Sequence, residues 1–224
     1  MRSAPVHELN ADSLRGLFPA GVSCAFSNEP PEMISLPADE AHAARKMRAE
    51  RQREFAHGRA CARLALAEFG MPNCTVPVGS ARAPVWPDGF IGSISHSGIF
   101  AAAVAARSNG TNGLGVDLEI NEGLDMALLP MICRPEELEW LSTTDSGTPV
   151  AKLIFSAKEC VFKCVWPEFQ EFIDFQELEV RMNLRQKTYT VIPHATRLPD
   201  ELIRRVHGRY EIAKNLIATA AFYD

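Results

Sequence analysis

The stretch GVDLEI (residues 115–120) places two carboxylates inside an otherwise apolar run. The run reads as a strand, and side chains on a strand alternate between its two faces, so Asp117 and Glu119 share one face while the aliphatic residues between them occupy the other. Like charges on one face repel each other. We therefore expect either a solvent-exposed polar face or a hard divalent cation between the two carboxylates, and the hexapeptide alone leaves both open.

Length and composition describe an ordinary globular protein. The chain has 224 residues, of which 46% are hydrophobic and 23% charged, enough to bury a core in one large domain or two smaller ones. No apolar run approaches the ~20 residues that span a bilayer, and the N-terminus lacks the apolar core of a signal peptide. We expect a cytoplasmic protein without a membrane role. The six cysteines show no C-x-x-C pattern, which favours reduced thiols.

Charge is unevenly distributed along the chain. The formal net charge of -5 argues against a general nucleic-acid binder. Lys and Arg gather in residues 45–63, acidic residues in 117–179, and basic residues again in 181–214. Such segregation is typical of solvated helices, but it also suits a protein that holds a polyanion beside a metal ion.

The order of helical and strand-like patterns predicts the fold class. Helical patterns cover residues 38–69, with a break at Gly58, then 134–142 and 150–167; strand-like patterns cover 21–27, 90–107 with an intervening Ser/His turn, 115–120, 178–193 and 212–224, with residues 204–210 as a connection. We expect an α+β fold of two similar lobes with a pseudo-twofold relation, residues 1–110 and 111–224.

A second informative stretch is FSAKECVFKCV (residues 155–165). Ser156 and Glu159 fit a capping box, in which each side chain satisfies a backbone N–H at a helix start. Lys163 lies one turn after Glu159, the spacing of a common surface ion pair. The buried face of this helix is expected to carry Phe162, Val165 and Trp166.

Taken together, GVDLE and the following FSAKECVFK resemble the signature pair of 4′-phosphopantetheinyl transferases, in particular the type that activates surfactin and enterobactin synthetases. The resemblance extends to REFAHGRACARLAL (residues 53–66) and RAPVWPDGFIGSISHS (residues 82–97), so it covers about residues 45 to 170. One departure is Cys160, where the family often has Ser. The separate blocks in the right order make the resemblance specific.

The resemblance implies a monomeric, two-lobed transferase with the phosphopantetheinyl transferase fold. Such an enzyme moves the phosphopantetheine arm of coenzyme A to a serine hydroxyl of an apo acyl or peptidyl carrier protein and releases 3′,5′-ADP. The carrier would belong to a fatty-acid, polyketide or nonribosomal-peptide synthase, as in siderophore biosynthesis. Nucleic acid and membrane are not expected partners.

The resemblance also implies roles for individual residues. Mg²⁺, or Mn²⁺ in its place, would be held by Asp117, Glu119 and Glu159. Glu159 would also accept the serine proton, directly or through a metal-bound water, and Lys163 would balance charge on the leaving group. The remaining coenzyme A contacts would be Arg59 at the 3′-phosphate with Arg51 and Arg63 as helpers, His96 at the pyrophosphate, Lys158 as a further lysine, and Arg82, Ser95 and Ser97 around the nucleotide.

Simpler interpretations stay open for the same residues. An arginine on a helix is often only solvated, a histidine between serines is often a turn residue, and Glu159 fits a helix cap. Two other functions also stay open: a Mg²⁺-dependent phosphohydrolase acting on coenzyme A or a nucleotide, and a non-enzymatic binding or scaffold protein. The chain lacks the dinucleotide, P-loop, G-x-S-x-G and H-x-x-x-H patterns.

Overall fold

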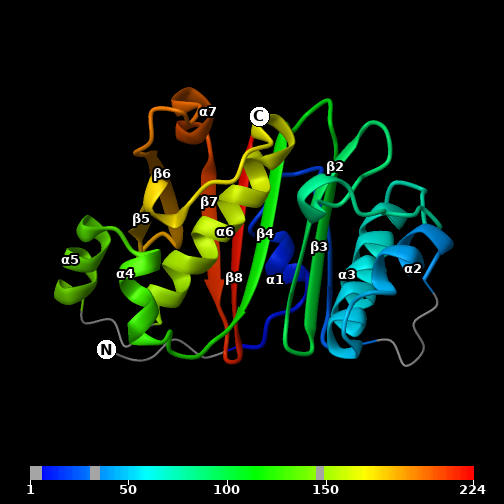
Figure 1. The fold of residues 1–224 in the computed structure, drawn as a ribbon, viewed down its shortest axis with the longest axis horizontal. Helices are drawn as coiled ribbons and strands as arrows, with labels where there is room; N and C mark the ends of the chain where they lie inside the picture. Colours follow the sequence, from blue (N-terminus) through cyan, green and yellow to red (C-terminus); the bar gives the residue numbers. More distant parts are fainter. Residues whose placement is uncertain (1–6, 31–35, 145–148) are drawn as a thin grey trace.

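The computed structural model describes residues 7–30, 36–144 and 149–224, and it shows two antiparallel sheets with helices packed against them (Figure 1). The first sheet has the strand order β1-β3-β2 and the second β4-β8-β7-β6-β5. The predicted α+β class is confirmed, although the lobes are unequal, with three strands in one sheet and five in the other. The elements are α1 (Ala11–Arg15), β1 (Ser23–Ser27), α2 (Ala38–Ala44), α3 (Ala49–Ala67), η1 (Ser80–Arg82), β2 (Phe90–Ser97), β3 (Phe100–Arg107), β4 (Gly113–Ile120), η2 (Met126–Leu128), α4 (Leu129–Ile132), α5 (Pro135–Thr143), α6 (Val150–Phe169), η3 (Phe175–Glu177), β5 (Leu178–Asn183), β6 (Thr188–Pro193), α7 (Asp200–Arg204), β7 (His207–Ile212) and β8 (Leu216–Tyr223).

In the first lobe, the long helix α3 covers one face of the three-stranded sheet (Figure 1). Small and aliphatic residues recur on α3 at helical spacing and meet alternate alanines of β3, which lets the two elements pack closely. The predicted helix break at Gly58 is wrong, because the chain leaves the helix between α2 and α3 instead. Gly58 lies inside α3, where a Cβ would come within 2.7 Å of the Ile94 side chain on β2.

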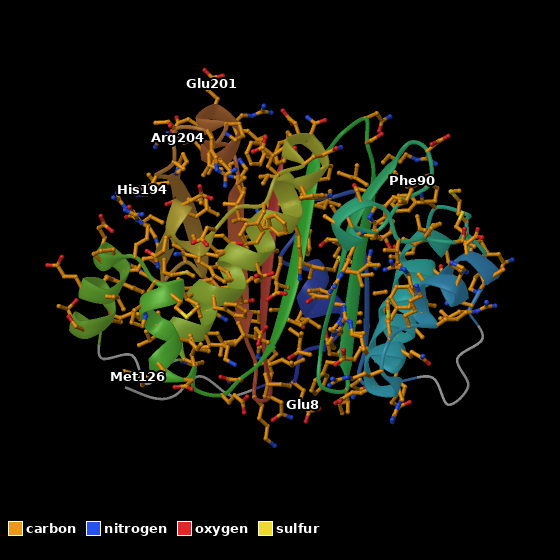
Figure 2. The ribbon with its side chains drawn as sticks, viewed as in Figure 1. Glu8, Phe90, Met126, His194, Glu201 and Arg204 are labelled. Carbon is orange, nitrogen blue, oxygen red and sulfur yellow. The ribbon has the colours of Figure 1, made fainter. Side chains whose placement is uncertain are left out.

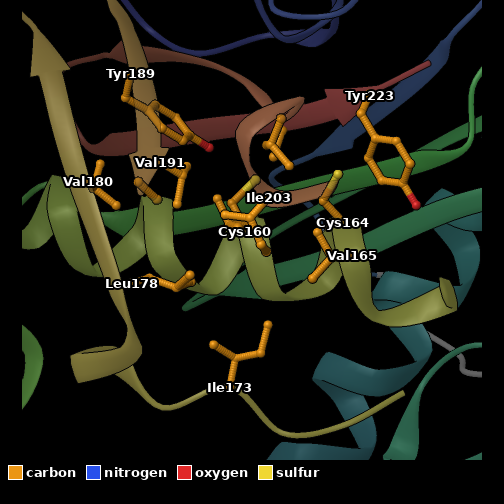
Figure 3. Close-up of a cluster of buried hydrophobic side chains, with 14 of the residues drawn as sticks. Cys160, Cys164, Val165, Ile173, Leu178, Val180, Tyr189, Val191, Ile203 and Tyr223 are labelled. Atoms are coloured by element: carbon orange, nitrogen blue, oxygen red, sulfur yellow. The ribbon is translucent and has the colours of Figure 1, made fainter. Parts of the chain in front are cut away.

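In the second lobe, α6 packs across the five-stranded sheet. Its buried stripe recurs at three- and four-residue spacing and meets residues of β5, β6 and β8 in one apolar cluster (Figure 3). The hydroxyl of Tyr189 in this cluster donates to the Ala220 carbonyl at 2.9 Å, so the buried phenol is satisfied. The predicted helix over residues 150–167 is confirmed by α6.

One strand and one turn of the structure differ from the predictions. Residues 204–210 were expected to be a connection, yet β7 pairs with β8 and β6. The alternation of buried and exposed residues in β7 is short, because only Gly208 and Tyr210 are buried, and it does not mark a strand clearly in the sequence. The Ser/His turn is also wrong, because His96 lies on β2 and the turn to β3 falls at Gly98 and Ile99.

The two sheets meet where β2 and β4, each the last strand of its sheet, lie side by side. The Val116 N–H donates to Ser93 Oγ at 3.1 Å, and the Leu118 N–H donates to Ser95 Oγ at 3.1 Å. The constant offset between these pairs means that the two strands run parallel. Serine hydroxyls therefore join the sheets along this seam.

An apolar cluster also crosses from one lobe to the other. Leu14 and Phe18, from the N-terminal part, pack with Val116 of β4 and Phe222 of β8. The expected lobe boundary after residue 110 falls between β3 and β4 and stays a prediction. Charged side chains such as Glu201 and Arg204 on α7 lie at the periphery (Figure 2). Among the described residues, no helix combines the length and apolar character needed to cross a membrane.

Candidate active site

The acidic strand β4 supplies the centre of the site. Asp117 is only 4% exposed, and both of its carboxylate oxygens are engaged. Oδ1 accepts from Ser95 Oγ at 2.9 Å and from Lys163 Nζ at 2.6 Å, and Oδ2 accepts from Ser156 Oγ at 2.8 Å. Side chains from β2, β4 and α6 thus converge on one buried carboxylate. The expectation of a simply solvated polar face is wrong for this residue.

Helix α6 brings three polar side chains to the same place. Ser156, Glu159 and Lys163 follow at helical spacing on the face toward β4. The capping-box interpretation is wrong, because α6 begins at Val150 and Ser156 lies well inside the helix. Backbones of α6 and β4 come very close, since a Cβ at Gly115 would overlap the Cys160 carbonyl oxygen. This explains why glycine precedes the acidic residues.

Burial and mutual repulsion both raise the pKa values of carboxylates in the site. Burial, followed by the nearby Asp117, raises the pKa of Glu119 to about 7. Burial also raises the pKa of Glu159, and Asp117 adds to the effect. Lys152 Nζ lies 3.7 Å from a carboxylate oxygen of Glu119 and offsets part of its charge. A further cation would therefore be favourable beside these groups.

The carboxylate oxygens of Asp117, Glu119 and Glu159 suit Mg²⁺ or Mn²⁺ as ligands. A bound cation would relieve the repulsion between these carboxylates. Within the ranges that the structure describes, however, no three such side chains stand close enough together to surround an ion. Lys163 supplies the positive charge next to Asp117 instead. The residues fit a hard divalent cation by chemistry, and Asp117 would have to exchange its lysine contact to bind one.

Next to these carboxylates lies a cavity of about 320 Å³ between the lobes. Asp117, Glu159 and Lys163 form its polar wall. Phe162 and Trp166 contribute an apolar wall, although sequence analysis placed them in the core. The cavity therefore combines a charged end with an apolar surface.

A second cavity of about 740 Å³ lies against α3 and is strongly basic. Arg51, Arg82 and His96 line both cavities, so the two adjoin each other. The lining of the second cavity also includes Lys46, Arg48 and Arg59. A space of this size with one basic end and one acidic, apolar end suits an elongated polyanion.

Arg59 is the most unusual of these basic residues. It is 5% exposed, and its buried Nε has no hydrogen-bond partner among the described residues. Its pKa is lowered to about 10, first by burial and then by the neighbouring Arg63 and Arg51, while Glu40 opposes the shift. A buried, unsatisfied guanidinium is costly unless an anion reaches it.

Other predicted residues behave differently. Arg63 donates to the fully buried Glu40 at 2.8 Å, and this structural ion pair replaces its expected role as a phosphate helper. Ser97 lies at the end of β2 and lines neither cavity, so the prediction that it contacts the nucleotide is not supported. Ser95 lines the smaller cavity and Arg82 lines both, and their contact with the nucleotide stays a prediction.

Comparison with known protein families gives two matches that together cover most of the chain. The 4′-phosphopantetheinyl transferase N-terminal domain matches residues 39–106, and the 4′-phosphopantetheinyl transferase superfamily matches residues 113–220. The chain belongs to the 4′-phosphopantetheinyl transferase superfamily. It is therefore an enzyme that transfers the 4′-phosphopantetheine arm of coenzyme A to carrier proteins, and the predicted family is confirmed.

Individual relatives agree with this assignment. The chain is 33% identical over 217 residues to the 4′-phosphopantetheinyl transferase Npt of Nocardia iowensis, covering 92% of this chain and 98% of the relative. It is 36% identical over 206 residues to the 4′-phosphopantetheinyl transferase Svp of Streptomyces mobaraensis, covering 88% and 82%. Enterobactin synthase component D of Salmonella typhi is 39% identical over 117 residues, covering 51% and 48%. A solved holo-ACP-synthase from Plasmodium yoelii is 13% identical with a TM-score of 0.36, covering 50% of this chain and 94% of that chain.

One predicted coenzyme A contact of this phosphopantetheinyl transferase is wrong. Lys158 is 1% exposed and lies away from both cavities. Its Nζ donates to the Ile132 carbonyl at 2.7 Å, to Glu137 Oε2 at 2.7 Å and to the Phe175 carbonyl at 2.8 Å. These three bonds use every ammonium proton. Lys158 therefore ties α6 to α5 and to the segments around it.

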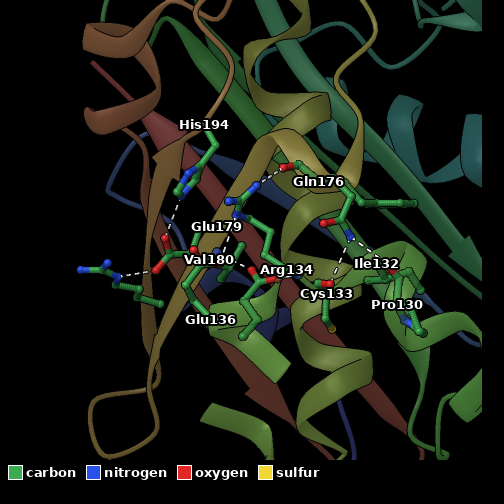
Figure 4. A network of polar contacts seen from close by, with 12 residues as sticks. Pro130, Ile132, Cys133, Arg134, Glu136, Gln176, Glu179, Val180 and His194 are labelled. Carbon is green, nitrogen blue, oxygen red and sulfur yellow. Dashed lines mark hydrogen bonds and ion pairs between the residues drawn. The ribbon is translucent and has the colours of Figure 1, made fainter. Parts of the chain in front are cut away.

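The same region of the transferase is held by further polar contacts (Figure 4). Glu137 Oε1 accepts from the Val180 N–H of β5 at 2.7 Å. Gln176 Nε2 donates to the carbonyls of Pro130 and Cys133, each at 3.1 Å. Together with Lys158, this network fixes α4, α5 and β5 against α6.

Proposed function

We propose that coenzyme A lies across the two adjoining cavities, with its adenosine 3′-phosphate in the basic one and its diphosphate where they meet. The observation that carries this proposal is their shared wall of Arg51, Arg82 and His96, between a basic space and a cluster of carboxylates. An elongated anion with phosphates at two separate places matches that distribution of charge.

Arg59 is our candidate for the 3′-phosphate contact. Its buried Nε lacks a partner among the described residues, and its guanidinium stacks over the Phe55 ring at 4.5 Å, which fixes its plane. A phosphate would supply the missing acceptor and offset the cost of burying the charged guanidinium. Arg51 and Arg82 line the path from there to the diphosphate region.

The pantetheine arm would follow the apolar side of the smaller cavity. Phe162 and Trp166 pack edge to face at 5.5 Å and present a rigid aromatic wall there. The arm is uncharged and its methyl and methylene groups can pack on aromatic rings, so it suits this surface better than the basic cavity. The thiol end would then point out of the cleft and leave the diphosphate near Lys163.

Asp117, Glu119 and Glu159 are the residues that would hold Mg²⁺ or Mn²⁺. When bound, such an ion neutralises diphosphate charge and polarises the phosphorus under attack. Lys163 already balances Asp117 at 2.6 Å; burial works against its charge, yet Asp117 keeps its pKa raised. Released from Asp117, this ammonium would be available to the leaving phosphate.

Glu159 is our candidate for the general base. Burial raises its pKa, which makes the carboxylate a stronger base toward a hydroxyl. The oxygen of the carrier serine forms a bond to the phosphorus that bears the pantetheine arm, and its proton passes to Glu159. The bond from that phosphorus to the leaving oxygen breaks, and 3′,5′-ADP departs with the electron pair.

Intact-mass spectrometry of an apo peptidyl carrier protein tests these roles. We expect the carrier to gain one phosphopantetheine arm in the presence of the enzyme, coenzyme A and Mg²⁺, and to gain none with EDTA. Glu159→Gln should slow the transfer by roughly 10²–10⁴-fold, the usual worth of a general base. Glu122→Gln is a matched control, because it removes an exposed carboxylate just beyond β4.

Other outcomes identify the alternatives. Cleavage of coenzyme A without modification of any carrier would favour the phosphohydrolase. Unchanged transfer by Glu159→Gln would refute its role as base. Parallel reactions with acyl carrier and peptidyl carrier proteins would show which class the enzyme prefers, and size-exclusion chromatography would test the predicted monomer.

A further inference from the structure

Glu54 is an acidic residue in the wall of the basic cavity, where a site for a phosphate would be expected to have none. Among the described residues that line the basic cavity, five are Lys or Arg and Glu54 is the single acid. A carboxylate in this position repels a bound phosphate, so by charge alone it should weaken coenzyme A binding. Its contacts indicate a different effect.

Glu54 touches two residues that line both cavities. Its Oε2 accepts from an Arg51 guanidinium nitrogen at 3.1 Å, and the same oxygen lies 3.7 Å from Nδ1 of His96. Arg51 in turn donates to Nε2 of His96. The three side chains form a closed triangle that joins α3 to β2 at the junction of the cavities.

The contacts of the triangle favour one tautomer of the His96 ring. One Arg51 nitrogen lies 3.5 Å from Nδ1 and closer to Nε2, and a guanidinium can only donate, so Nε2 is the ring nitrogen better placed to accept. Burial, together with Arg51, lowers the pKa of His96 to about 4, so the ring is neutral near pH 7. A neutral ring with a bare Nε2 must carry its hydrogen on Nδ1, which faces Glu54.

We propose that Glu54 is a positioning residue that holds Arg51 and His96 in place at the junction of the two cavities. Arg51 is half-exposed, and a long side chain of this kind loses considerable rotamer freedom when a ligand fixes it. Glu54 orders Arg51 before coenzyme A arrives and so reduces that loss. The inference rests on the proposed binding of coenzyme A in these cavities.

The two effects of Glu54 predict opposite signs, which makes calorimetric titration with coenzyme A decisive. If positioning dominates, Glu54→Ala weakens binding by roughly tenfold, about the worth of one charged hydrogen bond, and Glu54→Gln by less because its amide oxygen still accepts from Arg51. If repulsion dominates, both variants bind more tightly than the wild type, and the proposal is overturned.

Glu50→Gln is the matched control. Glu50 lies one turn earlier on α3, is exposed, and does not line the basic cavity, so its removal changes the same charge without the contact. We expect Glu50→Gln to bind coenzyme A as the wild type does or slightly more tightly. A loss equal to that of Glu54→Ala would refute a specific role for Glu54.

Nitrogen-15 NMR of the ligand-free protein gives a second readout that a merely structural residue would not move. The His96 ring, assigned by its loss in His96→Asn, should show the Nδ1–H tautomer in the wild type and a mixture in Glu54→Ala. An unchanged tautomer in Glu54→Ala would overturn the positioning role. If wild-type protein binds no coenzyme A, the proposed function fails, and the tautomer still decides whether Glu54 orients His96.

Discussion

Replacing Lys158 by methionine removes a buried charge while keeping most of the side-chain volume. Lys158 Nζ makes three hydrogen bonds of 2.7 to 2.8 Å, one of them to a Glu137 carboxylate that is itself 2% exposed. Lys158→Met leaves that carboxylate buried without its counter-ion. It also leaves the Ile132 and Phe175 carbonyls without their donor, although Glu137 keeps the N–H groups of Val180 and Arg134.

The cost follows from the burial of the pair. Removing one partner of a buried ion pair typically destabilises a protein by about 3–5 kcal/mol, because the remaining charge is uncompensated. Methionine fills the space of the aliphatic stem, so little cavity cost is added. For a chain of this size, each kcal/mol shifts the melting temperature by about 2–4 °C, which gives a loss of roughly 6–20 °C.

Urea denaturation followed by circular dichroism measures this loss, and calorimetric titration with coenzyme A provides the second readout. Arg15→Ala is the control, since it breaks an ion pair with Glu68 whose side chains are 46% exposed and should cost less than about 1 kcal/mol. A loss below 1 kcal/mol for Lys158→Met would refute the argument. Weaker coenzyme A binding by Lys158→Met at unchanged stability would also refute it and would indicate that Lys158 contacts the substrate.

Three further predictions concern single positions. In EDTA, the free energy of unfolding should fall as pH rises from about 4.5 to about 7. The reason is that Glu119, with its pKa raised to about 7, keeps its proton to higher pH in the folded state than in the unfolded state. In melts at several pH values, Glu119→Gln should flatten this fall, and an equal fall in the variant would contradict the prediction. Gly115→Ala should destabilise the protein by more than about 2 kcal/mol in urea titration and reduce carrier modification. A Cβ at this position overlaps the Cys160 carbonyl and pushes α6 away from β4. Wild-type stability and activity of the variant would refute this argument. In native protein, DTNB should modify Cys74 quickly and the five buried cysteines slowly, with all six reacting in denaturant; rapid reaction of several thiols would indicate a looser core.

The site was predictable from sequence where short-range periodicity was enough. Alternation in GVDLEI placed Asp117 and Glu119 on one face, and helical spacing placed Glu159 and Lys163 together. The capping box predicted at Ser156 is wrong, because the pattern S-x-x-E also occurs inside helices and does not show where a helix begins. The Ser156 hydroxyl instead donates to Asp117, 39 residues away in the sequence, and local patterns cannot reveal such a contact.

Long-range pairing also explains the errors. Lys158 follows the same local rules as a surface lysine, and its contacts with Glu137 of α5 and with the Ile132 and Phe175 carbonyls make it structural. Likewise, Arg63 pairs with Glu40 of another helix. Glu54 escaped notice because an acid on a basic helix suggests an ordinary surface pair, and its proximity to His96 arises only when α3 packs beside β2.

The serine seam between β2 and β4 has a consequence for the solubility of the enzyme. Each of these strands ends its sheet, and an uncovered apolar edge such as GLGVDLEI is a template for pairing with other chains. Each lobe therefore covers the other's exposed edge. Mutations that widen the cleft for larger substrates would uncover both edges together, so we expect such variants to aggregate before they unfold.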